Sequence, residues 1–178
     1  MSTDGDLLLE RVLPTADDTT ALGRALAAHL RAGDVLVLVG ELGAGKTTFT
    51  QGLGDGLGVR GPITSPTFVL SRVHPSLVGG PDLVHVDAYR LAGAGEVDDI
   101  DLDDTVATSV TVIEWGAGVA EQLSDSWLTV ELLRATGGDA STGEDVAADE
   151  DPDDPRTVRL TGHGPRWRGA QLHLPSEA

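Results

Sequence analysis

The chain reads Gly-Glu-Leu-Gly-Ala-Gly-Lys-Thr at residues 40–47, which fills every fixed position of the phosphate-binding loop G-x-x-x-x-G-K-S/T. Lys46 in this stretch is the only lysine of the protein, whereas the other eleven basic residues are arginines. The compact ammonium of a lysine reaches the β- and γ-phosphates of a nucleotide as a point charge. The stretch therefore predicts a site for a nucleoside triphosphate.

A buried strand and a helix are expected on the two sides of this loop. Val-Leu-Val-Leu-Val at residues 35–39 is a continuous apolar run, typical of a parallel strand buried on both faces. After the loop, Phe49, Leu53 and Leu57 recur at helical spacing, and Gly58 is expected to end the helix. The loop then leads into a helix N-terminus, where free N–H groups and the helix dipole hold phosphate. This context disfavours a mere Gly-rich turn.

Apolar patterns elsewhere predict the remaining elements. Residues 7–13 are expected to form an edge strand, which Pro14 ends. A helix with an apolar stripe from Leu22 to Leu30 follows, capped by Asp17 or Asp18 and ended by Gly33. Further strands are expected at residues 67–73, 83–86, 111–113, 128–133 and 157–160. The last two are predicted to form an antiparallel hairpin.

Strands and helices thus alternate around the phosphate loop, which is typical of a three-layer α/β protein. We expect a P-loop NTPase-like fold with a mostly parallel central sheet and a C-terminal antiparallel hairpin. The 178 residues fit a single domain, 1–178. Because the chain has no cysteine, disulfides and Cys-based metal sites are excluded. The five histidines are not paired at a ligand spacing, so we interpret them as surface or packing residues.

The net charge of −17 is unevenly distributed, because residues 137–155 contain eight acids and no base. This stretch is rich in Gly, Ala and Pro and is expected to be a disordered acidic loop. It lacks the ligand spacing of an EF-hand. A second acidic run, residues 96–104, is expected to form a short amphipathic element. A chain this negative repels a phosphate backbone, which disfavours direct binding of nucleic acid.

The sequence also predicts the cellular compartment. It shows no N-terminal signal of basic and apolar residues and no apolar run approaching ~18 residues. We therefore expect a cytoplasmic protein without a membrane segment.

Two acidic residues stand where predicted strands end. Asp87 follows Leu-Val-His-Val at residues 83–86, and Glu114 follows Val-Ile at residues 112–113. Ligands of α/β proteins bind at the carboxyl ends of such strands, and Mg²⁺ takes hard oxygen ligands. The hydroxyl of Thr47 and one or two carboxylates are therefore candidate magnesium ligands, with one acid left to orient the attacking water. Alternatively, either acid caps a helix or faces solvent.

Three further side chains have two interpretations each. Ser65 and Thr67 lie in Thr-Ser-Pro-Thr at residues 64–67, where hydroxyls either sense the γ-phosphate or start the following strand. Trp115 directly follows Glu114. It lies either beside the nucleotide or a partner surface, or it fills the core.

Four motifs resemble, in order and spacing, those of the TsaE family, the small bacterial ATPases of tRNA threonylcarbamoyladenosine synthesis. They are Gly-Glu-Leu-Gly-Ala-Gly-Lys-Thr-Thr-Phe (40–49), Ser-Pro-Thr-Phe (65–68), His-Val-Asp-Ala-Tyr-Arg-Leu (85–91) and Ile-Glu-Trp (113–115). The similarity runs from about Leu8 to Leu133. Beyond it only residues 157–168 resemble the family, and the acidic stretch departs from it.

The resemblance implies an ATPase that binds ATP and Mg²⁺, joins a TsaB–TsaD-like pair, and supports modification of adenosine 37 in tRNAs reading codons that begin with A. Such a protein would reach tRNA through these partners. The resemblance also implies Lys46, Asp87 and Glu114 as catalytic residues, with magnesium on Thr47 and Glu114. The implied nucleotide contacts are Leu42, Gly43, Ala44, Gly45, Lys46 and Thr47, together with Ala16, which aligns by position only, and Trp115 is implied as an important aromatic. Thr48, Ser65, Thr67 and Trp115 are predicted as further nucleotide contacts.

Two other classes of function are weighed against this one. A small-molecule or nucleotide kinase needs an acceptor pocket and usually a lid that supplies arginines, and the sequence has no Arg-rich segment of that kind. A GTP-dependent binding switch without required hydrolysis would use an Asn-Lys-x-Asp type of signature, and the single lysine already lies in the phosphate loop.

Overall fold

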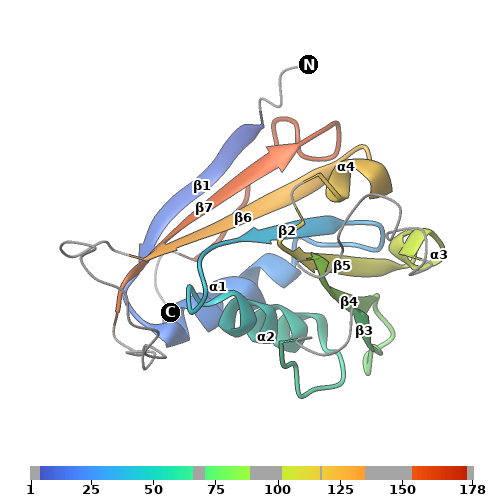
Figure 1. The fold of residues 1–178 in the computed structure, drawn as a ribbon, viewed down its shortest axis with the longest axis horizontal. Helices are drawn as coiled ribbons and strands as arrows, with labels where there is room; N and C mark the ends of the chain where they lie inside the picture. The colour runs from blue at the N-terminus through green and yellow to red at the C-terminus, as the bar shows by residue number, and fades with distance from the viewer. Residues whose placement is uncertain (1–4, 66–70, 89–101, 117, 135–153, 176–178) are drawn as a thin grey trace.

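A computed structural model describes residues 5–65, 71–88, 102–116, 118–134 and 154–175 (Figure 1). Its elements in chain order are β1 (Asp6–Leu13), α1 (Ala16–Ala27), β2 (Val35–Val39), α2 (Lys46–Leu57), β3 (Ser71–His74), β4 (Asp82–Asp87), α3 (Leu102–Val106), β5 (Ser109–Glu114), α4 (Ala120–Leu123), β6 (Trp127–Arg134) and β7 (Arg156–His163). The predicted strand before the loop and the helix after it, which ends at Gly58, are confirmed.

The seven strands form one sheet in the order β1-β7-β6-β2-β5-β4-β3. Strand β2 pairs in parallel with β5 and β6, and β4 pairs in parallel with β5. The outer pairs, β1 with β7, β7 with β6, and β3 with β4, are antiparallel. The expected parallel centre is confirmed for the four strands β6, β2, β5 and β4, and the expected antiparallel hairpin is formed by β6 and β7. Strands β1 and β3 also pair antiparallel, so the whole sheet is mixed.

Chain connections explain the antiparallel edges. Strand β3 ends at His74 and β4 begins at Asp82, which is too short a connection for the crossover that a parallel pair needs. At the other edge, β6 and β7 form the predicted hairpin, with a register from Trp127 opposite His163 to Arg134 opposite Arg156. Among the described strands, β1 pairs only with β7, and it is the predicted edge strand.

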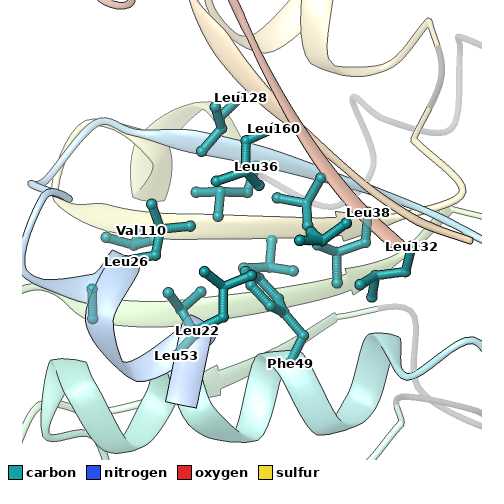
Figure 2. Packing of buried hydrophobic residues seen from close by; sticks show 14 of the residues in the cluster. Leu22, Leu26, Leu36, Leu38, Phe49, Leu53, Val110, Leu128, Leu132 and Leu160 are labelled. Carbon is teal, nitrogen blue, oxygen red and sulfur yellow. The ribbon is translucent and has the colours of Figure 1, made fainter. Parts of the chain in front are cut away.

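Alternating side chains of the central strands feed two hydrophobic clusters on opposite faces of the sheet. On β2, Leu36 and Leu38 join the cluster shared with α1 and α2, which Figure 2 shows around Phe49 and Leu53. Val35 and Val37 of the same strand join a smaller cluster with the short helices α3 and α4. Helices therefore pack on both faces of the sheet, and the phosphate loop leads from β2 into α2 on the face that α1 and α2 cover.

Helix α1 begins earlier than the sequence indicates. Its N-cap is Thr15, whose hydroxyl accepts a hydrogen bond from the backbone N–H of Asp18 at 3.2 Å. Asp18 in turn accepts from the backbone N–H of Thr15 at 2.9 Å, so the predicted capping acid is the second partner of a capping box. The helix ends at Ala27, and Gly33 belongs to the turn that follows it.

Several sequence-based expectations fall partly or wholly outside the described residues. Of the predicted strand at 67–73 the described part begins at Ser71. Of the acidic run 96–104, the described part begins with Leu102, in α3. Of the acidic loop 137–155 only Asp154 and Pro155 are described. Within the described ranges, no helix has the length and apolar character needed to cross a membrane.

Candidate functional site

The phosphate loop connects β2 to α2 at the carboxyl end of β2. Gly43 and Gly45 have positive φ values of 77° and 100°, a conformation that glycine adopts without steric cost. Gly45 is the N-cap of α2, and no side-chain cap is found there among the described residues. The first N–H groups of α2 are therefore not used by a capping side chain, which is the arrangement that binds anions at helix N-termini.

Lys46 lies folded over this loop. Its Nζ donates to the carbonyl oxygens of Gly40 at 2.7 Å and Glu41 at 3.0 Å. Burial lowers the pKa of Lys46 from its ordinary value, while the nearby carboxylates of Glu114 and Asp87 raise it. The structure thus brings together the three side chains that the sequence separates by up to 68 positions.

Asp87 and Glu114 lie side by side at the carboxyl edge of the sheet. They end β4 and β5, and their Cα atoms are register partners in the parallel pair. Both residues are buried, with exposed fractions of 9% and 5%. Their strand positions alternate with residues of the α3 and α4 cluster, so both carboxylates lie on the α2 face. The interpretation of Glu114 as a solvent-facing acid is therefore wrong.

His85 is a site residue that the sequence analysis missed. It is completely buried, and its Nε2 lies 2.9 Å from Oε1 of Glu114. A carboxylate oxygen can only accept, so the imidazole donates this hydrogen bond. His85 precedes Asp87 by two residues on β4 and so shares its face of the sheet. This two-residue spacing is the signal that could have identified it as more than a packing residue.

Trp115 does not fill the core. The residue is 45% exposed, and the Nζ of Lys46 lies 4.6 Å from the ring centroid, within cation–π distance. The residue has a φ of 60°, a left-handed conformation that is costly for a bulky side chain and is often found at functional sites. The structure therefore favours the expectation that Trp115 stands beside the nucleotide site.

Arg156 reaches the loop from the hairpin and shares a carboxylate with Arg134, although the sequence indicates no arginine cluster here. Arg156 of β7 donates from Nε to the carbonyl of Ala44 at 3.2 Å and from Nη2 to that of Gly43 at 3.3 Å. Asp154 forms ion pairs with Arg134 at 3.0 Å and Arg156 at 2.9 Å. Because Arg134 and Arg156 are separated by the acidic stretch, no local pattern could have revealed this cluster.

The other predicted contact residues are exposed or partly exposed where the structure describes them. Ala16 is exposed at the start of α1. One turn on, the methyl of Thr19 lies 3.7 Å from the place a Cβ on Gly45 would take. Leu42 is 90% exposed, Thr47 and Thr48 are partly exposed in the first turn of α2, and Ser65 is exposed. Thr67 lies outside the described residues.

The donor set at this edge suits magnesium better than zinc. The described part of the chain contains no group of three or more His, Asp and Glu side chains placed to hold a metal. Magnesium does not need one, because it keeps several waters and binds one or two carboxylates plus phosphate oxygens. The hydroxyl of Thr47 and the carboxylate of Glu114 are hard oxygen donors of this kind.

Comparisons with known proteins give relatives from one family. The family model described as "Threonylcarbamoyl adenosine biosynthesis protein TsaE" matches residues 13–141. A Streptomyces coelicolor protein named "tRNA threonylcarbamoyladenosine biosynthesis protein TsaE" is 54% identical over 154 residues, which are 86% of this chain and 96% of that protein. A Mycobacterium tuberculosis protein of the same name is 48% identical over 134 residues, or 71% and 80% of the two chains.

A solved structure gives the same result. The crystal structure of YdiB from Bacillus subtilis matches with a TM-score of 0.67 at 29% identity, covering 94% of this chain and 93% of that one. The region matched by the family model contains the phosphate loop, Asp87, Glu114 and Trp115, and it ends before Asp154 and Arg156. On this combined evidence, the chain belongs to the TsaE family of tRNA threonylcarbamoyladenosine biosynthesis proteins.

Proposed function

We propose that this protein binds ATP with magnesium at the phosphate loop and hydrolyses it. The observation that carries the proposal is the position of Lys46, whose buried ammonium lies over the loop at the N-terminus of α2 and close to two carboxylates. The loop N–H groups and Lys46 would bind the phosphates. Thr47 and Glu114 would hold the magnesium, which when bound neutralises charge that develops on the phosphates.

The two buried carboxylates would divide the remaining work. Glu114 is oriented by the hydrogen bond from His85, which suits a ligand that must keep one direction. Asp87, next to it in register, would orient the attacking water. Trp115, over Lys46, would cover the outer side of the nucleotide. Ala16, Leu42, Thr48, Ser65 and Thr67 are proposed as further contacts.

In the cell, we propose that this ATPase supports threonylcarbamoylation of adenosine 37 in tRNAs that read ANN codons, acting through TsaB–TsaD-like partners. Family membership supports the pathway. The net charge of −17 supports the indirect route, because a strongly negative chain repels the tRNA backbone. ATP hydrolysis would then reset the complex between turnovers.

Replacing Lys46 tests the nucleotide site. Lys46→Ala should abolish ATPase activity and weaken ATP binding, because a charge-assisted contact is worth about 1.5–3 kcal/mol. Arg24→Ala is the matched control, since it removes a cation from an exposed ion pair with Asp55, which is expected to contribute little. Unchanged turnover in the purified Lys46→Ala protein would contradict the proposal. Binding measured with both ATP and GTP would separate an ATPase from a GTP switch.

Co-purification tests the proposed partners. A TsaB–TsaD-like pair should be retained by this protein in an ATP-dependent manner, and tRNA should be retained only when that pair is present. Tight binding of tRNA by the protein alone at physiological salt would overturn the indirect route.

A further inference from the structure

We propose that Arg156 is a positioning residue of the phosphate loop, held in place by Asp154 and Arg134. The inference rests on the proposed nucleotide binding, but Arg156 and Asp154 lie beyond the region matched by the family model. The side chain of Arg156 is only 9% exposed. Its donors contact the loop at the carbonyls of Gly43 and Ala44, 3.3 Å and 3.2 Å away.

Because of peptide geometry, these two contacts determine the direction in which N–H groups of the loop point. In a trans peptide the carbonyl of one residue and the N–H of the next lie in one plane and point in opposite directions. When Arg156 holds the carbonyl of Ala44, the N–H of Gly45 must point away from Arg156. Gly45 is the N-cap of α2, so this N–H belongs to the group that binds anions at the helix N-terminus.

The second contact stabilises the preceding peptide in the same way. The carbonyl of Gly43 shares its peptide unit with the N–H of Ala44, which donates to the carbonyl of Glu41 at 3.0 Å and closes a turn within the loop. Arg156 therefore orients two successive peptides of the loop. A guanidinium suits this task because its donors lie in a planar fork, which a lysine ammonium lacks.

Asp154 and Arg134 fix the guanidinium itself. The backbone carbonyl of Asp154 accepts a hydrogen bond from Nη1 of Arg156 at 2.6 Å. The carboxylate of Asp154 also forms an ion pair with the same Nη1 at 2.9 Å. The same carboxylate accepts from Nε and Nη2 of Arg134 at 3.2 and 3.0 Å. Arg134 and Arg156 are register partners at the end of the hairpin. Together, Arg134, Arg156 and Asp154 carry one net positive charge, which favours an anionic ligand.

Nucleotide titration of matched variants tests the inference. Arg156→Met should raise the Kd for ATP by about tenfold, because losing the net contribution of about one well-oriented hydrogen bond weakens binding by roughly that factor. Arg159→Met is the control: it removes an arginine from the same strand, but one that pairs with Glu10 and Glu131 away from the loop, and its Kd should remain that of the unmodified protein. Circular dichroism at the titration temperature establishes that each variant is folded.

Two further variants keep the test decisive if Arg156→Met does not fold. Arg156→Lys retains the charge but cannot span both carbonyls and Asp154, so it should bind ATP several-fold more weakly than the unmodified protein. Asp154→Asn should weaken ATP binding in the same direction. Wild-type affinity in the folded Arg156→Lys or Asp154→Asn protein would overturn the positioning role. Suppose that Lys46→Ala no longer binds ATP, whereas folded Arg156→Met binds it as tightly as Arg159→Met does: the positioning role then fails and the proposed function stands. If Lys46→Ala binds ATP as tightly as the unmodified protein, the proposed function itself fails.

Discussion

Helices α1 and α2 pack so closely that a single methyl group on Gly52 should force them apart. A Cβ built on Gly52 would lie 2.1 Å from the carbonyl oxygen of Thr20 and 2.9 Å from its Cα, both in the backbone of α1. Ordinary contact for a Cβ begins at 3.4 Å, which is 1.3 Å (3.4 minus 2.1) beyond the available space. Backbone atoms cannot rotate away as a side chain can. Gly52→Ala must therefore displace one helix relative to the other.

The expected change in stability is the difference between two opposing terms. Overpacking of a well-packed core costs about 1–3 kcal/mol, whereas Ala in place of Gly in a helix returns about 0.8–1 kcal/mol. Because the clash is with backbone, we expect the upper part of the first range and a net loss of about 1–2 kcal/mol in the free energy of unfolding. For a protein of this size, each kcal/mol lowers Tm by about 2–4 °C.

Gly54→Ala on the same helix is the matched control. Its Cβ would also meet an atom at 2.1 Å, but that atom is the terminal Cδ1 of Ile63, which can rotate. Gly54 and Ile63 line a surface pocket of about 280 Å³, which gives the side chain room. The helix-propensity gain is the same in both variants, so it cancels in their difference. An off-rotamer Ile costs about 0.5–1.5 kcal/mol, and Gly54→Ala should be near neutral.

Urea and thermal unfolding of both variants measure this difference, and ATP titration measures its functional effect. Helix α2 begins at Lys46, so its displacement should also weaken ATP binding in Gly52→Ala but not in Gly54→Ala. A Gly52→Ala protein as stable as Gly54→Ala would refute the packing argument.

Three further predictions concern the site and the acid range. His85→Leu should raise the magnesium concentration needed for binding of Mg-ATP, measured by isothermal titration, because the buried carboxylate of Glu114 loses a hydrogen bond worth about 1.5–3 kcal/mol. His85→Gln keeps an N–H donor and should bring this magnesium requirement back toward that of the unmodified protein. Equal magnesium requirements in the two variants would count against the orienting role of His85. The change in tryptophan fluorescence on nucleotide binding should vanish in Trp115→Phe and persist in Trp167→Phe, since the ring of Trp167 is buried in the core. Loss of this fluorescence change in Trp167→Phe would disprove the prediction. Burial lowers the pKa of His74 below its ordinary 6.5, so the folded state binds fewer protons than the unfolded chain, and the free energy of unfolding should fall as pH drops below 6.5. In His74→Gln the free energy of unfolding should depend less steeply on pH in that window, and an unchanged dependence would exclude the effect.

Contiguous residues explain why much of the fold could be predicted. The run Val35–Val39 and the spacing within Lys46–Leu57 are local patterns, and the structure places a strand and a helix at these bounds. The sequence does not single out the cap of α1, because Thr15, Asp17 and Asp18 are all good capping residues. The choice depends on backbone conformation, and Thr15 is the extended one, with a φ of −132°. Strand direction at the edges likewise depends on connections that composition does not encode.

What the sequence by itself determined is the chemical inventory of the site: one lysine in a phosphate loop, a hydroxyl after it, and an acid at the end of each of two strands. Each of these can be read locally, because the loop, strand and helix patterns have short periods. Only the tertiary structure decided which groups meet. It places His85 on Glu114, Lys46 under Trp115, and Arg156 on a loop carbonyl 112 residues away in the chain. These contacts depend on strand order and register, which arise from packing across the whole sheet and not from the residues next to each group in the sequence.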